Sequence, residues 1–169
     1  MRRWMISVVM GMVMGYGAES NTTQPTVKKA ATKMVIGRLE QVRVMEVGIA
    51  KKARIDTGAK TTSIDAHEIQ LFERDGQAWV RFTFEDEPIE KPVVRTVLIK
   101  RHGGKSIRRQ VVELELKLGQ TVQTVEVTLA NREKYTYAIL IGRNFLRKRF
   151  LVDVSRVFMG CSNTSIPVF

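Results

Sequence analysis

The sequence is poor in residues that build cross-links and metal centres. Its 169 residues include one cysteine, Cys161, and two histidines. A single cysteine excludes an intramolecular disulfide, and a thiolate-rich structural zinc site is excluded because it needs about four ligands. Aromatic residues make up only 7% of the chain. Because proteins that hold single-stranded nucleic acids combine a basic groove with stacking aromatic rings, we expect no nucleic-acid partner.

The chain begins with a hydrophobic run that is too short to cross a membrane. Residues 4–16 are uncharged and mostly apolar, whereas a transmembrane helix needs about 20 such residues. Two arginines precede this run, and Gly15 and Gly17 place small residues at its end. This layout predicts a signal peptide over residues 1–17, secretion across the inner membrane to the periplasm, and no stable membrane insertion after cleavage. The alternative is a buried N-terminal strand or helix.

The remaining chain divides into a linker and one domain. Residues 18–33 are polar, contain Pro25 and show no periodicity, which indicates a flexible linker. The predicted folded domain covers residues 34–169. Hydrophobic residues make up 44% of the sequence, enough for a packed core.

Short alternating runs broken by glycine predict an all-β domain. Residues 68–73 and 78–84 flank Asp75-Gly76, a strong hairpin signal. A second hairpin is predicted from residues 93–100 and 107–118, and a further strand from residues 121–129. Residues 138–141 predict a short strand buried on both faces, and residues 142–149 the one short helix, near the C-terminus. Many short strands at this spacing indicate a sandwich or a small barrel.

The candidate chemical motif is Asp56-Thr57-Gly58-Ala59, which follows an apolar strand. Gly58 permits a tight turn in which backbone N–H groups approach the Asp56 carboxylate, and the Thr57 hydroxyl can bond across a symmetric contact. Two such carboxylates at close range share one proton. One can then take a proton from water while the other donates to a peptide carbonyl. On its own, however, Asp-Thr-Gly is a weak signal, because any Asp-x-Gly turn imitates it, and an ordinary turn is then the favoured interpretation.

The second half of the chain supplies a matching motif. Residues 137–146 form an apolar strand, then Gly142, then Arg143 at the start of the predicted helix. With the Asp56 segment, in that order, they resemble the two halves of a retropepsin-type aspartic protease. Residues 53–63, 109–112 and 150–155 look like a bacterial retropepsin-like family that is often labelled "ATP-dependent zinc protease". That family is related to a peptidase linked to polyglutamate ligases, and the resemblance spans residues 34–157.

This resemblance implies a small closed β-barrel and an aspartic endopeptidase that acts as a homodimer. Each chain would contribute one Asp56 to a shared catalytic dyad, with Thr57, Gly58 and Ala59 supporting the turn and Gly142 and Arg143 forming the structural second motif. The residues give no support to the family label. Gly104-Lys105-Ser106 lacks the first glycine of a phosphate-binding loop, and His67-Glu68 lacks the second histidine of a zinc protease. We therefore expect no cofactor and no metal.

One position departs from the pattern of viral retropepsins, where an acidic residue follows the Asp-Thr-Gly-Ala and pairs with the arginine of the second motif. Here that position is Lys60, so Arg143 lacks its usual partner. We hypothesise that Lys60 instead faces acidic substrate side chains. Ala59 offers no hydroxyl to the dyad, so the charged form of the dyad is less stabilised than it would be by Ser or Thr at this position. We therefore expect activity nearer neutrality than in pepsin-like enzymes.

The strong positive charge favours an acidic peptide or protein substrate. The chain has 28 Lys and Arg against 17 Asp and Glu, a formal charge of +11, which falls to 11 − 2 = +9 if the signal peptide is removed. The hairpin that carries Arg101, Lys105 and Arg109 is a candidate flap over the cleft, and its cations are candidate substrate-binding residues. The alternatives are a solvated basic face or a non-catalytic periplasmic β-barrel that binds an anionic peptide or envelope polymer through its basic surface. A third alternative, which the resemblance implies, is a peptidase specific for glutamate-rich tails, and the predicted signal peptide argues against a cytoplasmic version of that role.

Overall fold

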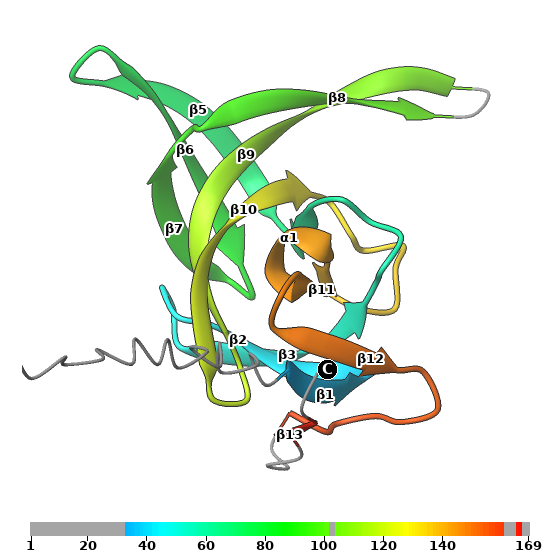
Figure 1. Ribbon diagram of the computed structural model, residues 1–169. Coiled ribbons are helices and arrows are strands. Elements are labelled where there is room, and N and C mark those ends of the chain that lie inside the picture. The colour runs from blue at the N-terminus through cyan, green and yellow to red at the C-terminus, as the bar shows by residue number, and fades with distance from the viewer. Residues whose placement is uncertain (1–32, 102–103, 161–164, 167–169) are drawn as a thin grey trace, which may run out of the picture.

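The structure is a computed structural model that describes residues 33–101, 104–160 and 165–166. These residues form one short helix, α1, and a series of strands joined by tight turns (Figure 1). The elements are β1 (Lys33–Gly37), β2 (Leu39–Val44), β3 (Ile49–Ile55), β4 (Thr62–Asp65), β5 (His67–Arg74), β6 (Gln77–Phe84), β7 (Glu87–Pro92), β8 (Arg95–Arg101), β9 (Gly104–Leu118), β10 (Thr121–Ala130), β11 (Ile139–Ile141), α1 (Arg143–Leu146), β12 (Phe150–Asp153) and β13 (Ser165–Ile166).

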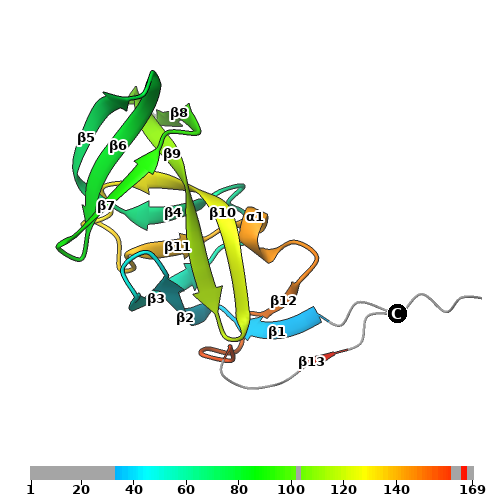
Figure 2. The same cartoon turned by 90° about the vertical axis from the view of Figure 1, so that its left-hand side faces the viewer.

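Six strands close into a barrel. They lie in the order β10-β4-β11-β3-β2-β9, and antiparallel pairing of β9 with β10 closes the ring. Strand β8 pairs with the N-terminal half of β9, beyond the barrel. The β8–β9 hairpin therefore projects from the barrel as an arm (Figure 1), and Figure 2 views the molecule roughly along this arm. The predicted all-β class, the closed barrel and the single short helix near the C-terminus are confirmed.

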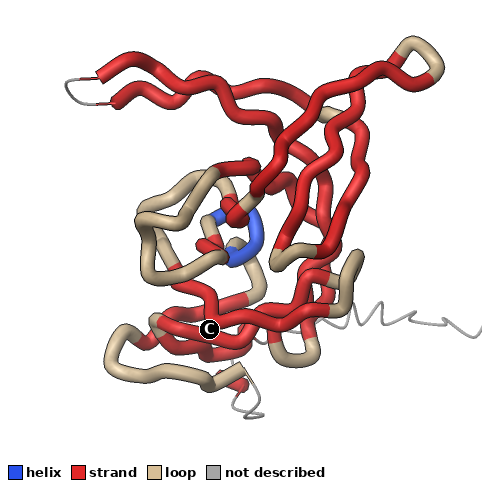
Figure 3. Tube along the Cα trace, turned by 180° about the vertical axis from the view of Figure 1, so that it is seen from behind, coloured by secondary structure: helices blue, strands red, loops and turns tan. Residues whose placement is uncertain are grey.

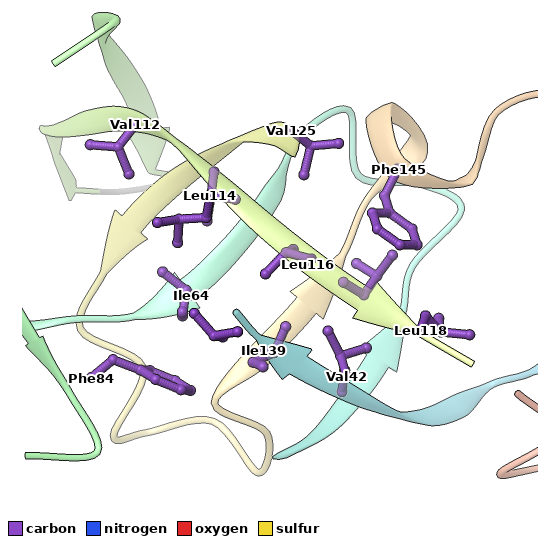
Figure 4. Packing of buried hydrophobic residues seen from close by; sticks show 14 of the residues in the cluster. Val42, Ile64, Phe84, Val112, Leu114, Leu116, Leu118, Val125, Ile139 and Phe145 are labelled. Carbon is purple, nitrogen blue, oxygen red and sulfur yellow. The ribbon is translucent and has the colours of Figure 1, made fainter. Parts of the chain in front are cut away.

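The barrel interior follows from the alternation of side chains along the strands. In β9, Leu114, Leu116 and Leu118 are fully buried, while the residues between them face solvent. In β10, Val125 and Val127 are buried in the same way. Figure 4 shows the three leucines and Val125 meeting side chains from β2, β4, β11 and α1 in one cluster, to which Val127 also belongs. Burial of this contiguous cluster is the main stabilising contribution to the fold.

A second sheet, β5-β6-β7, packs one face against the barrel. Phe82, Phe84 and Ile89 point inward and are buried. The turn between β5 and β6 is Asp75-Gly76, and both residues have positive φ, as a two-residue hairpin turn of the primed type requires. The predicted hairpin at this position is confirmed.

A third sheet, β12-β1-β13, joins the two ends of the domain and was not predicted. Strand β1 pairs in parallel with β12 and antiparallel with β13. After β12, residues 154–160 form a segment that we call the strap. Glu40 holds this segment in place. The buried Glu40 carboxylate accepts backbone N–H groups of Gly37, Met159 and Gly160 at 2.6–2.9 Å. A buried carboxylate needs such donors, so Glu40 anchors the strap.

Two details differ from the sequence expectations. Strand β11 begins at Ile139 and is not buried on both faces, because Leu140 is partly exposed and lines a pocket. The helix ends at Leu146, and residues 147–149 form a turn. The predicted signal peptide, almost all of the predicted linker, and Cys161 lie outside the described residues. In the described part of the chain, no helix has the length and apolar character needed to span a membrane.

Candidate active site

The Asp56 loop leaves the barrel between two parallel strands. Strand β3 ends at Ile55 and lies beside β11, and the Asp56 backbone N–H donates to the carbonyl of Ile141 at 2.9 Å. This bond fixes where the chain turns outward. The Asp56 carboxylate is only partly buried. Its Oδ1 accepts the N–H of Gly58 at 2.9 Å and of Ala59 at 3.1 Å, the arrangement that the glycine turn predicts. Among the described residues, Oδ2 accepts no hydrogen bond, so it is available to react.

Arg143 braces the loop from the side of α1. Its guanidinium donates to the carbonyl of Thr57 at 3.3 Å and of Gly58 at 3.1 Å, and its backbone N–H donates to the carbonyl of Ala59 at 2.9 Å. These carbonyls take the place of the acidic partner that Lys60 cannot supply. The Nε of Arg143 is buried and has no hydrogen-bond partner within the described chain.

Asn144 and Thr62 tie the loop to the barrel, and neither was predicted. The Asn144 side-chain carbonyl accepts the N–H and the hydroxyl of Thr62, both at 2.9 Å, and its amide donates to the carbonyl of Glu126 at 2.7 Å. Position 142 requires glycine, because a Cβ there would clash with the backbone of Thr61 at 2.6 Å. The Gly-Arg-Asn tripeptide could have pointed to the role of Asn144. Its side-chain amide, at the start of the predicted helix, has both a donor and an acceptor with which to join two segments.

A pocket of about 440 Å³ lies beside this loop, beneath the β8–β9 hairpin. We call it the flap pocket. Strand β8 contributes Arg95, Val97 and Ile99, and β9 contributes Arg109. Figure 3 shows the hairpin extending above the loops that surround the helix. The remaining lining residues come from the loop, β4, β10, β11 and the segment after β10: Ala59, Lys60, Thr61, Ser63, Thr128, Arg132 and Leu140.

The flap pocket is cationic. No acidic residue lines it, and four of its lining side chains carry positive charge: Lys60, Arg95, Arg109 and Arg132. The structure brings together Lys60 and Arg109, two of the predicted substrate-binding candidates. Arg101 and Lys105 lie in strands near the free end of the hairpin, and their side chains are outside the described part. Arg95 and Arg132 were missed because no local motif marks them.

Arg132 is the most buried of these cations, with 6% of its surface exposed. Its backbone N–H donates to Asp65 Oδ1 at 2.5 Å, and its Nε donates to the carbonyl of Tyr137 at 3.1 Å. Burial lowers the pKa of Arg132, and it outweighs the opposing effect of Tyr135 and Asp65. The positive charges of Arg109 and Arg54 act in the same direction as burial, by less.

Arg95 anchors the hairpin to the barrel. Its guanidinium meets the carboxylate of Glu126 on β10 at 2.5 Å. The hydrogen bond from Arg95 holds the pKa of Glu126 below its usual range. Arg95 therefore serves both as a wall of the flap pocket and as the tie that holds β8 in place.

His67, the first residue of β5, lies between two carboxylates. Its Nε2 lies 3.1 Å from Asp65 Oδ2, and its Nδ1 lies 3.5 Å from Glu133 Oε1. In the described residues, no cluster of three or more His, Cys, Asp or Glu is arranged to hold a metal ion. The expected absence of metal and cofactor stays a prediction. Asp65 and Glu133 instead link β4 to the segment that carries Arg132.

Comparison with known proteins places the chain in a family. Residues 35–162 match the family described as retropepsin-like aspartic endopeptidase RimB. Probable alpha-L-glutamate ligases of Desulfotalea psychrophila and Shewanella pealeana are 39% and 38% identical over 132 and 137 residues. These matches cover 72% and 75% of this chain but only 28% and 30% of the ligases. The chain thus spans less than a third of the length of these relatives.

A solved structure shares the fold of this chain. A crystal structure of a Legionella pneumophila protein of unknown function superposes with a TM-score of 0.66 at 31% sequence identity, covering 75% of this chain and 98% of that one. The residues that match the family, 35–162, include the Asp56 loop, the β8–β9 hairpin and the second motif. The chain belongs to the RimB-like family of retropepsin-like aspartic endopeptidases.

Proposed function

We propose that this chain is an aspartic endopeptidase whose dyad forms from the Asp56 carboxylates of two copies, and that it prefers acidic peptides. The observation that carries the proposal is the placement of Asp56. Its carboxylate is held by two backbone N–H groups, is partly open to solvent and lies on the loop that also lines the flap pocket. One copy supplies one Asp-Thr-Gly, so two copies are needed for the proton-sharing pair.

The reaction follows from the chemistry of a paired carboxylate. One Asp56 removes a proton from a water molecule, which attacks the carbonyl carbon of the scissile peptide bond. The partner copy's Asp56 donates its proton to the carbonyl oxygen. The resulting tetrahedral intermediate collapses, the C–N bond breaks, and the leaving amine takes up a proton. Gly58 and Ala59 N–H groups keep Asp56 in position throughout.

The preference for acidic peptides rests on the flap pocket and on the relatives. The pocket has four cations and no lining carboxylate, so acidic side chains gain attraction there and basic ones are repelled. The similar proteins are named as probable alpha-L-glutamate ligases. A domain of this kind attached to such a ligase would lie beside glutamate-containing chains, which fits the same substrate class.

The first experiment compares cleavage of a peptide library by the purified chain and by Asp56→Asn at several pH values. We expect cuts next to acidic residues, their loss in the variant, and a maximum rate nearer neutrality than in pepsin-like enzymes. A pH–rate profile that peaks below about 4, near the ordinary Asp value, would contradict the pH expectation. Absence of cleavage by a folded, dimeric protein would instead favour the anion-binding alternative.

Charge reversal tests the acidic preference separately. Arg109→Glu is expected to lower kcat/KM for acidic peptides by about tenfold or more relative to neutral ones, and Lys60→Glu should act in the same direction. The matched control is Arg108→Glu, because Arg108 is the exposed neighbour of Arg109 on β9 and does not line the flap pocket. Equal losses for acidic and neutral peptides would contradict a role in specificity.

Periplasmic localisation is part of the proposal and rests on residues 1–17 alone. Fusion of residues 1–33 to a reporter that is active only after export tests it. We expect the natural sequence to export the reporter. Replacement of Val8 and Val9 by charged residues interrupts the apolar run and should abolish export. A reporter that stays inactive with the natural sequence would contradict the localisation.

A further inference from the structure

Four neighbouring hollows on the barrel share lining residues. The flap pocket shares Arg132 with a hollow that also contains Arg54 and Tyr137. Arg54 and Tyr137 line the next hollow, beside Ile55. Tyr137 then continues, together with Leu39, into a hollow of about 700 Å³. We call the three hollows beyond the flap pocket the outer groove.

Strand register explains why two of these hollows lie along one row of residues. Leu39 pairs with Arg54, Arg54 with Leu140, Leu140 with Ser63, and Ser63 with Thr128. Residues paired across neighbouring strands place their side chains on the same face of a sheet. This row therefore runs across five strands on the outer face of the barrel. Its β4, β10 and β11 members line the flap pocket, and its β2 and β3 members line the outer groove.

The outer groove is also cationic. Its lining includes five basic side chains, Arg38, Lys51, Lys52, Arg54 and Lys134, in addition to Arg132. Its acidic lining residue, Glu85, is already paired with Lys51 at 2.5 Å. Arg54 is exposed and has no ion pair within the described chain, and Lys52 lies over the Phe158 ring, 5.9 Å from its centre. The groove thus offers unpaired cations above a partly apolar floor.

We infer that the outer groove is a second binding region, which holds an acidic peptide segment lying beyond the one in the flap pocket. Four strand spacings of about 4.8 Å separate β10 from β2, roughly 19 Å, which about six extended residues would span. The inference rests on the proposed preference for acidic peptides. It adds that the chain recognises the length of an acidic run and does not read a single acidic residue at the cut site.

The test measures binding without cleavage. Fluorescently labelled oligoglutamates of 4, 8 and 12 residues are titrated with Asp56→Asn full-length protein and followed by anisotropy. Affinity is expected to rise from the 4-mer to the 8-mer and then to level off. Lys52→Glu, in the same background, is expected to weaken binding of the 12-mer about three- to tenfold and to leave the 4-mer unchanged, because the short peptide is held in the flap pocket.

The control is Lys117→Glu, which makes the same charge change at an exposed strand residue that lines none of the four hollows. It should leave the 12-mer affinity near that of the parent. Equal affinity for the 4-mer and 12-mer, or equal effects of Lys52→Glu and Lys117→Glu, would overturn the inference. Because no peptide bond is cut in this assay, length-dependent binding with no hydrolysis by the natural sequence would remove the proposed activity and leave the groove standing.

Discussion

At the scale of single residues, the Asp56 loop is held by groups that come from the other half of the chain. Arg143 donates to two loop carbonyls, and Asn144 joins Thr62 to Glu126. Thr57 and Gly58, at the tip of the loop, are exposed. The geometry of the loop therefore depends on these hydrogen bonds, which span more than 80 residues of sequence in the case of Arg143.

Replacement of Arg143 tests this dependence. Arg143→Leu leaves the Thr57 and Gly58 carbonyls without their donor and is expected to lower the free energy of unfolding by about 1–3 kcal/mol and to reduce kcat more than it raises KM. Urea denaturation and steady-state kinetics measure the two effects. Arg147→Leu, at an exposed arginine just beyond α1, is the control. A stability loss in Arg147→Leu equal to that in Arg143→Leu would contradict the assigned role.

Asp65 is the second residue whose replacement is informative. Its carboxylate accepts the Arg132 N–H and faces His67. Asp65→Ala leaves the Arg132 N–H without that acceptor, so we expect a loss of about 1–3 kcal/mol of stability and faster amide hydrogen exchange over residues 131–138. Exchange that is unchanged in this segment would show that Asp65 does not position Arg132.

At the scale of elements, the β8–β9 hairpin is fastened at its base by the Arg95–Glu126 pair. Because the folded-state pKa of Glu126 is lowered, the pair's contribution is fully present above the ordinary Glu value of about 4.3. It is lost as the pH falls through the lowered value. We expect the Glu126 carboxyl to titrate below its ordinary range by NMR, and Arg95→Gln to restore ordinary titration. A titration midpoint that Arg95→Gln leaves unmoved would contradict the assignment.

The elements also show what the sequence could and could not predict. Period-two alternation identifies β9 and β10, and Asp75-Gly76 identifies the β5–β6 turn, because these signals are local. Strand β1 pairs with β12, more than 110 residues away, and such parallel pairing leaves no local pattern. Glu40 alternates with Val42 and Val44 on the inward-facing side of β2. A charged residue at an inward-facing position was the sequence signal for the strap that Glu40 anchors.

The candidate site divides in the same way. Asp56, Gly58, Gly142 and Arg143 belong to short motifs, so they could be found by reading the chain. The flap pocket is assembled from β4, β8, β9, β10, β11 and the segments after β3 and β10. Arg132 enters it only because residues 131–138 return to the sheet beside β3. Tertiary placement of this kind is not visible in composition or spacing.

At the scale of the whole molecule, basic side chains line both the flap pocket and the outer groove. The long-range field of such a surface speeds encounter with anionic chains and weakens as salt is added. We therefore expect KM for acidic peptides to rise steeply with salt while KM for neutral peptides changes little. Equal salt dependence for both substrates would show that the surface charge does not select them.

The central claim is that one active site uses Asp56 from two copies. Mixing tests it most directly: Asp56→Asn protein is added in increasing amounts to a fixed amount of natural protein, with time for subunit exchange, and peptide cleavage is followed. If each site needs two aspartates, mixed dimers are inactive, and activity should fall to about half at an equal ratio and continue to fall with excess variant. Activity that stays constant as the variant is added would contradict the shared dyad.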